Sequence, residues 1–350
     1  MAETPIRFGF PMFTKSISTD YIVKNKNICI SDIWAFWDYA IRMHKKNKAG
    51  VNLEFMLSLV EQAQYFYTAA LSAPIKSQPL LYYYSFLNLA KIVINMDTFH
   101  GTTVKYMHGI SNKIEPTTTL SNAELKISDS NIPQNKYSIA SEFMKLMGDN
   151  FAGATYPLTL LVKNLLKGCV GIHRAYCETY NEKEIFHRLL SSHLQKNGMN
   201  LNWESRIKDC DSTLNGLLVA NGYSIDTRVE NGITNYYLKN EFVMTHYTPT
   251  RDDFFQLSQQ TLQKGLWSHY DADEIRYYIS EDCYKYSSAS IIYLLMFFLG
   301  SITRYHPYLF DNLISDKERW LVGEFLKNQP KQFLYYVTSR TIGGTLSYKL

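Results

Sequence analysis

The stretch Pro79–Asn95, with sequence PLLYYYSFLNLAKIVIN, places the strongest constraint on how this chain can fold. It is apolar almost all round, which is typical of a helix that neighbours bury on most sides. Its polar residues fall within about one third of the helical wheel: Ser85, Asn88, Lys91 and Asn95. Because an unpaired buried polar group costs about 1–3 kcal/mol, this stripe needs partners. Those partners are either a hydrogen-bonded network of the core or a functional site.

A second helix is expected immediately before this one. Asn52 can cap its start, apolar residues follow at helical spacing through Leu71, and Pro74 ends it. Two helices joined by so short a link pack antiparallel, and we expect Leu87 to lie in the core between them.

The remainder of the chain is expected to be mostly helical, with one β-containing part. Asn231-Gly232 between two β-rich segments predicts a hairpin, and Ile275–Ser280 predicts a strand. Amphipathic spacing predicts a helix over Glu182–Lys196, Ser287–Ile302 has the pattern of a second buried helix, and Pro330 is expected to separate two last helical pieces.

These expectations define a mainly α fold. We expect a helical bundle domain over residues 1–199, a small β-containing insertion over residues 200–280, and C-terminal helices over residues 281–350 that return to the bundle.

The net charge of +4 is below the balance expected of a dedicated nucleic-acid-binding domain. Cysteine usage points to a cytoplasmic protein, because the five cysteines are scattered without CxxC pairs, which favours reduced thiols. The longest apolar run, Ile291–Leu299, is too short for a bilayer, which takes about 20 residues. The N-terminal residues lack the apolar segment of a signal peptide. We therefore expect no membrane association.

The usual signatures of metal and cofactor enzymes are missing from the sequence. It contains no Gly-rich phosphate loop after a strand, no G-x-S-x-G elbow and no H-E-x-x-H. Cys169, His173 and Cys177 are spaced at four residues. On one helix the two cysteines would lie roughly 12 Å apart, too far to share a zinc ion. We expect no metal and no cofactor.

The tetrapeptide Arg304-Tyr305-His306-Pro307 closes a strongly apolar segment and has two interpretations. Cations at a helix C-terminus offset the helix dipole, which is a structural role. An arginine beside a histidine can equally bind a phosphate and move a proton. Arg188 and His193 match the R-x4-H spacing of HEPN ribonucleases, but on one helix they would lie about 140° apart.

Four stretches together resemble the YaaC-like family of bacterial proteins: Gln62–Ala70, Gln78–Lys91, His108-Gly109-Ile110 and Arg304–Pro307. The tyrosine-rich helix followed by a His-Gly turn also looks like the helical HEPN group, whose members include ribonucleases, toxins and inactive binding or dimerising modules. The resemblance implies a HEPN-like helical bundle. It marks five residues as the positions to watch: Tyr83, Asn88, His108, Arg304 and His306. The two-residue spacing of Arg304 and His306 departs from the HEPN pattern.

Two classes of function follow. The first is a non-catalytic interaction module, or a subunit of a bacterial stress or phage-defence complex, that forms homo-oligomers or binds a protein partner through aromatic-rich helices. The 27 tyrosines and the binding candidates Tyr83, Tyr84, Asn88 and Lys91 favour it.

The second class is a HEPN-like, metal-independent ribonuclease or toxin acting on RNA, with Arg304, His306 and His108 as catalytic candidates. Convergence of these three residues in one open pocket would favour the ribonuclease, and their burial apart would favour the interaction module.

Overall fold

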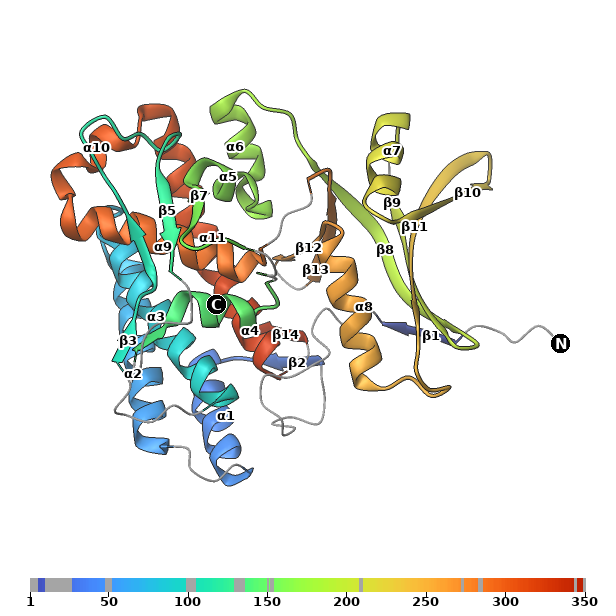
Figure 1. The fold of residues 1–350 in the computed structure, drawn as a ribbon, viewed down its shortest axis with the longest axis horizontal. Helices are drawn as coiled ribbons and strands as arrows, with labels where there is room; N and C mark the ends of the chain where they lie inside the picture. Colours follow the sequence, from blue (N-terminus) through green and yellow to red (C-terminus); the bar gives the residue numbers. More distant parts are fainter. Residues whose placement is uncertain are drawn as a thin grey trace.

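The computed structural model describes residues 6–9, 27–47, 52–98, 105–128, 136–149, 151, 154–207, 210–271, 274–282, 286–342 and 345–348. Most helices gather in one body, and a large sheet with two helices on it forms a second body beside it (Figure 1).

The expected helix pair is α2 (Leu53–Ser72) and α3 (Gln78–Asp97). The side chain of Asn52 caps α2 by accepting the Phe55 N–H at 3.0 Å, and Pro79 occupies the first turn of α3. The antiparallel pairing is confirmed, because residues in contact rise in number along α3 and fall along α2. Tyr82 contacts Tyr67, Tyr84 contacts Phe66, and Ser85 contacts Ala63.

Helix α3 lies at the centre of the helical body. It packs against α2, α4 (Ile139–Leu146), α9 (Ser288–Tyr305) and α11 (Asp316–Ile342). Phe86 stacks on Phe333 of α11 with ring centroids 3.9 Å apart, and Leu87 is buried as expected. The peripheral pieces are α1 (Ile33–Asn47), α5 (Val162–Lys167), η1 (Val170–Ile172), α6 (His173–Tyr180), η2 (Pro307–Leu309) and α10 (Phe310–Leu313).

Short strands also pair with one another within the helical body. β3 (Lys105–Met107) pairs in parallel with β6 (Lys136–Ser138), and β2 (Asn27–Ile30) pairs in parallel with β14 (Thr345–Tyr348). A three-stranded antiparallel sheet consists of β4 (Ile110–Asn112), β5 (Glu124–Ile127) and β7 (Leu158–Leu161). The long connection after α3 therefore carries strands of its own.

The second body is a seven-stranded antiparallel sheet of strand order β10-β11-β9-β8-β13-β12, with β1 also paired to β8. Helices α7 (Ser212–Ala220) and α8 (Arg251–Gln263) lie on it (Figure 1). Its strands are β1 (Ile6–Gly9), β8 (Phe186–Asn197), β9 (Asn200–Ile207), β10 (Ser224–Glu230), β11 (Ile233–Val243), β12 (Leu266–Asp271) and β13 (Glu274–Ser280).

This sheet shows that the prediction of a mainly α, HEPN-like bundle is wrong, because the fold is mixed α/β. The hairpin at Asn231-Gly232 and the strand at Ile275–Ser280 are confirmed as β10–β11 and β13. The helix expected over Glu182–Lys196 is instead the long strand β8. The sheet thus begins before residue 200, while the division of the chain into domains at 1–199, 200–280 and 281–350 stays a prediction.

Strands β12 and β13 of this sheet form a wall shared by two hydrophobic cores, one on each face. The larger core lies among the helices, and the smaller lies under α7 and α8. Neighbouring residues of β12 point to opposite faces, so Trp267 enters the larger core and Leu266 the smaller. In β13, Tyr278 and Ile279 divide in the same way.

Two further helices differ from a simple expectation. Helix α9 is long and apolar enough to meet the criterion for a membrane span, yet 78% of that window is buried inside the protein, as in a core helix. Helix α11 runs through Pro330 without a break, so the predicted separation into two pieces is wrong.

Candidate functional site

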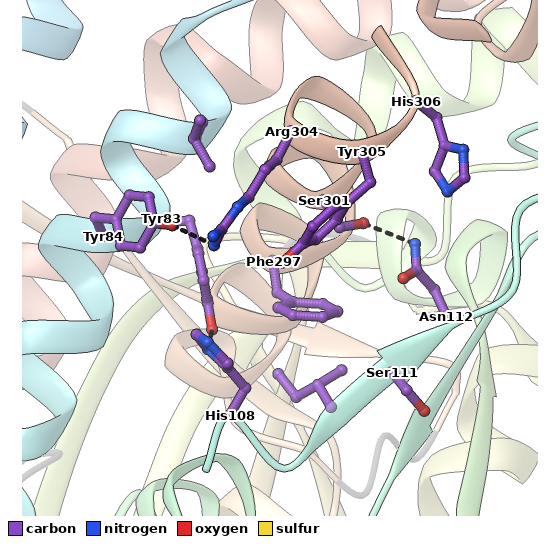
Figure 2. Close-up of a pocket in the computed structure, with 13 residues that line it drawn as sticks. Tyr83, Tyr84, His108, Ser111, Asn112, Phe297, Ser301, Arg304, Tyr305 and His306 are labelled. Carbon is purple, nitrogen blue, oxygen red and sulfur yellow. Dashed lines mark hydrogen bonds between the residues drawn. The ribbon is translucent and has the colours of Figure 1, made fainter. Parts of the chain in front are cut away.

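The candidate site is an open pocket of about 300 Å3 in the helical body (Figure 2). Its walls come from the start of α3, from the His108 turn with strand β4, and from the C-terminal end of α9. Five of the seven residues predicted from the sequence line it: Tyr83, Tyr84, His108, Arg304 and His306.

The His108 turn is held in place by its glycine. Gly109 has φ +71°, a left-handed conformation that side-chain-bearing residues rarely adopt. A Cβ atom at this position would lie 1.9 Å from the Ser138 hydroxyl oxygen, so the turn also packs closely on the end of β6. The backbone of the turn is paired as well, since the His108 carbonyl accepts the Ala140 N–H at 3.2 Å.

Close approach of α9 to α3 brings the third wall to the pocket. At Gly300 a Cβ atom would lie 3.2 Å from the Pro79 carbonyl oxygen and 3.3 Å from Tyr83 Cβ, so these helices nearly touch. One turn further along α9, the Thr303 hydroxyl donates to the Lys76 carbonyl at 2.7 Å. This contact fixes Arg304 beside the two tyrosines of α3.

Tyr83 and His108 form a hydrogen-bonded pair in the lining of the pocket, where Tyr83 is buried and His108 is exposed. The Tyr83 hydroxyl lies 2.5 Å from His108 Nδ1. Partial burial lowers the pKa of His108 below its usual range, and the positive charges of Lys91 and Arg304 lower it further. Burial likewise raises the pKa of Tyr83 well above its usual value, so both groups are neutral at pH 7.

Arg304 supplies the positive charge of the pocket. Its Nη1 donates to the Tyr84 hydroxyl at 2.5 Å, and its guanidinium carbon lies 5.0 Å from the centre of the Tyr305 ring. The side chain is exposed, and no carboxylate among the described residues forms an ion pair with it. A guanidinium held by a neutral hydroxyl keeps its full charge available to a ligand.

The other end of the pocket holds His306. It is the C-cap residue of α9, and its N–H donates to the Ile302 carbonyl at 2.9 Å. Figure 2 shows Arg304 directed toward Tyr83, Tyr84 and His108, whereas His306 lies on the opposite side near Asn112. The Asn112 amide donates to the Ser301 hydroxyl at 2.7 Å, which ties β4 to α9 there.

The two remaining predicted binding residues, Asn88 and Lys91, lie outside the pocket lining. The Asn88 amide donates to Gln62 of α2 at 3.4 Å, while Lys91 is largely buried and acts on the site through its charge near His108. Asn95 bonds the Tyr106 hydroxyl at 2.8 Å. Much of the polar stripe of α3 is therefore a structural network.

The weaker sequence motifs do not form sites in the described residues. Arg188 and His193 lie on strand β8 rather than on a helix. His173 donates from Nδ1 to the Lys167 carbonyl, and its Nε2 accepts the Ile185 N–H at 3.1 Å. Within the described parts of the chain, no group of three or more His, Cys, Asp or Glu residues is arranged to hold a metal ion.

Sequence reasoning missed part of the lining, chiefly Phe297, Tyr305, Ser301 and Asn112. Tyr305 could have been found, because it lies inside the Arg304–His306 motif. Ser111 and Asn112 gave no signal, because nothing in their local sequence indicates that β4 runs beside α9.

The lining contains one arginine, two histidines and several aromatic rings, and none of its residues is acidic. Such a pocket favours an anionic ligand, and imidazoles beside it can donate, accept or transfer protons. The fold and the pocket define an α/β protein with an open, cationic, aromatic-lined site between two buried helices.

The family model of the YaaC-like protein matches residues 25–341, and the chain belongs to this family. Comparison with curated proteins found no match, and comparison with solved structures found none either. The further resemblance to HEPN-type helical domains has no support in these comparisons, and the large sheet contradicts the bundle that it implied.

Proposed function

We propose that the pocket binds a phosphate group of RNA and that the protein is a metal-independent ribonuclease. The observation that supports this proposal is the convergence of His108, Arg304 and His306, which are far apart in the sequence, in one open pocket lined by no acidic residue.

The chemistry requires a base, a cation and a proton for the leaving oxygen, and the pocket supplies imidazoles and a guanidinium for the first two. An imidazole takes the proton of a ribose 2′-OH, whose oxygen then attacks phosphorus and expels the 5′-oxygen, leaving a 2′,3′-cyclic phosphate. The departing oxygen takes a proton from water or from a second protonated group. Arg304 faces the charge that grows on the phosphate oxygens, and its planar guanidinium suits two of them at once.

The aromatic rings fit a nucleotide rather than a simple anion. Tyr305 is 61% exposed at the edge of the pocket, and Tyr308 just beyond it is 72% exposed. Exposed aromatic rings next to a cation are typical surfaces for stacking the bases of a single strand.

The test is incubation of the purified full-length protein with structured and single-stranded RNA in EDTA. We expect cleavage to a cyclic phosphate, lowered about 10²–10³-fold by Arg304→Ala and about 10²–10⁴-fold by His306→Ala. Arg319→Ala and His246→Ala remove an exposed arginine and an exposed histidine outside the pocket and serve as matched controls. Cleavage that survives both pocket substitutions would contradict the proposal.

A second candidate is a non-catalytic interaction module that forms a homo-oligomer or serves as a subunit of a bacterial stress or phage-defence complex. It is favoured by five aromatic side chains of the described residues that are more than half exposed: Tyr65, Tyr247, Tyr305, Tyr308 and Trp320. Light scattering would show a dimer or larger species for this candidate. A strict monomer without a co-purifying partner would count heavily against it. With either function we propose a cytoplasmic location.

A further inference from the structure

The hydrogen bond between Tyr83 and His108 can run in two directions, and the direction decides what His108 can do. If Tyr83 donates to Nδ1, the neutral imidazole carries its proton on Nε2 and can donate to a ligand. If Nδ1–H donates to Tyr83, Nε2 carries a lone pair and can accept a proton. Among the described residues, Nδ1 has Tyr83 as its partner and Nε2 has no hydrogen-bond partner.

The surroundings of Tyr83 distinguish the two directions. The ring of Tyr293, from α9, lies 5.8 Å from that of Tyr83. The Tyr293 hydroxyl is fully buried and has no well-formed hydrogen bond of its own in the described residues. Among the described residues the Tyr83 hydroxyl therefore has one hydrogen-bond partner, His108 Nδ1.

The availability of acceptors favours donation from the Tyr83 hydroxyl to His108. When Tyr83 donates to Nδ1, its hydroxyl proton has an acceptor. In the reverse direction Nδ1–H would donate to the Tyr83 oxygen, and the proton of the Tyr83 hydroxyl would have no acceptor among the described residues, at a cost of about 1–3 kcal/mol.

We infer that Tyr83 is a positioning residue that fixes His108 in the tautomer with the proton on Nε2, so that His108 donates a hydrogen bond to an anionic oxygen of the ligand. His108 then acts beside Arg304 as an anion-binding group, and His306 is the imidazole of the pocket that accepts a proton. Assigning the anionic oxygen to RNA rests on the proposed function. The tautomer itself is a property of the free protein.

The positive charges that face His108 from neighbouring elements agree with this role. Lys91 of α3 and Arg304 of α9 disfavour an imidazolium at His108. A neutral imidazole that donates from Nε2 avoids this repulsion and still adds a donor beside the guanidinium. The pocket thus gains a hydrogen bond to the ligand without a further charge.

The first experiment needs no ligand. Two-bond proton–nitrogen spectra of the full-length protein, labelled with 15N at histidine, show which ring nitrogen of His108 carries the proton above its titration midpoint. We expect the proton on Nε2. In Tyr83→Phe we expect a mixture of tautomers and a His108 midpoint raised by about 0.5–1 pH unit, because a hydrogen bond to the neutral form has been removed.

Tyr84→Phe is the matched control. It removes a neighbouring hydroxyl that bonds Arg304 instead of His108, so the His108 tautomer should not change. Both variants keep their rings, and the contacts of Tyr83 with Phe297 and Tyr293 persist, so thermal melting should show that both are folded. A His108 protonated on Nδ1 in the wild type, or signals unaffected by Tyr83→Phe, would overturn the inference.

Titration with inorganic phosphate then tests the donor role. We expect phosphate to shift the Nε2–H signal of His108 and the side-chain signals of Arg304, and to bind Tyr83→Phe more weakly than the wild type at the same pH. Phosphate that shifts Arg304 but leaves Nε2 of His108 unchanged would overturn the donor role. If these results hold while RNA stays intact, the ribonuclease proposal fails and the inference stands.

Discussion

At the scale of single residues, the geometry of the pocket depends on Gly109 and Tyr83. Gly109 provides a backbone conformation that sets the direction of His108, and Tyr83 provides the hydrogen bond that orients its ring. The chemistry of the site therefore depends on residues that need not touch a ligand.

Gly109→Ala should damage the site and the fold together. A side chain at φ +71° is strained, and its Cβ atom would clash with Ser138, so we expect a loss of about 1–3 kcal/mol of unfolding free energy. Chemical denaturation measures that loss, and the His108 spectrum should shift with it. Gly198→Ala also has positive φ but open space around its Cβ atom, so it should cost less.

Asp149 gives the protein a predicted dependence on pH. Its carboxylate is buried at the start of α9, where one oxygen accepts the Ser287 N–H at 2.6 Å, and burial raises its pKa from 3.8 to about 7. Because the folded-state pKa is raised, the stabilising form is the protonated one. That stability is fully present below pH 4 and is lost as the pH rises through 7.

Asp149→Asn keeps an acceptor for the Ser287 N–H and removes the titration. We expect the melting temperature of the wild type to fall more between pH 5 and pH 8 than that of the variant. Equal pH profiles for the two proteins would show that Asp149 is already ionised in the folded state at low pH.

At the scale of elements, the crossing of α3 and α9 supports the pocket. Gly300→Ala pushes a methyl group against Pro79 and Tyr83, and we expect a loss of about 1–3 kcal/mol as the helices move apart. Gly323 of α11 is the matched control, because its Cβ atom would meet nothing nearer than Ile75 at 4.0 Å. Gly323→Ala should stabilise the protein by about 0.5–1 kcal/mol. Thermal denaturation of both variants tests this contrast.

The sequence predicted α2, α3 and α9 because each has a local start signal and a strongly apolar pattern: Asn52, Pro79 and Ser287 begin them. Strand β8 was missed because of a bulge. Its pairing with β9 shifts between Leu189 and Ser191, so Leu189 and Leu194, five residues apart, both enter the smaller core. Apolar residues at 186, 189, 190 and 194 then have helical spacing on a strand.

The residues of the site were easier to predict than their arrangement. Arg304 and His306 stood out as polar groups at the end of an apolar helix, and His108 stood out beside a glycine. Their meeting depends on the close approach at Gly300 and on the pairing of β3 with β6, which are long-range contacts that local patterns do not encode. The same reason hid Asn112 and Ser301.

At the scale of the whole molecule, the two cores should differ in local stability. Leu238 of β11 is fully buried in the smaller core, far from the wall shared with the helices. Leu238→Ala should cost about 2–5 kcal/mol and speed amide hydrogen exchange in β9–β11, while α3 and α9 keep their protection. Hydrogen-exchange mass spectrometry checks this. Equal acceleration in α3 would show that the protein unfolds as one unit.

The wall shared by the two cores also limits how the bodies can move. In a hinged protein, a few loop residues between rigid parts absorb the rotation. Here β8 leaves the helical body while its first residues, Phe186–Arg188, are still hydrogen-bonded to β13, and Trp267 and Leu266 of β12 anchor the same sheet edge in both cores. Any rotation of one body against the other must therefore twist a hydrogen-bonded sheet, so the connection between the bodies resists rotation more strongly than a flexible loop would.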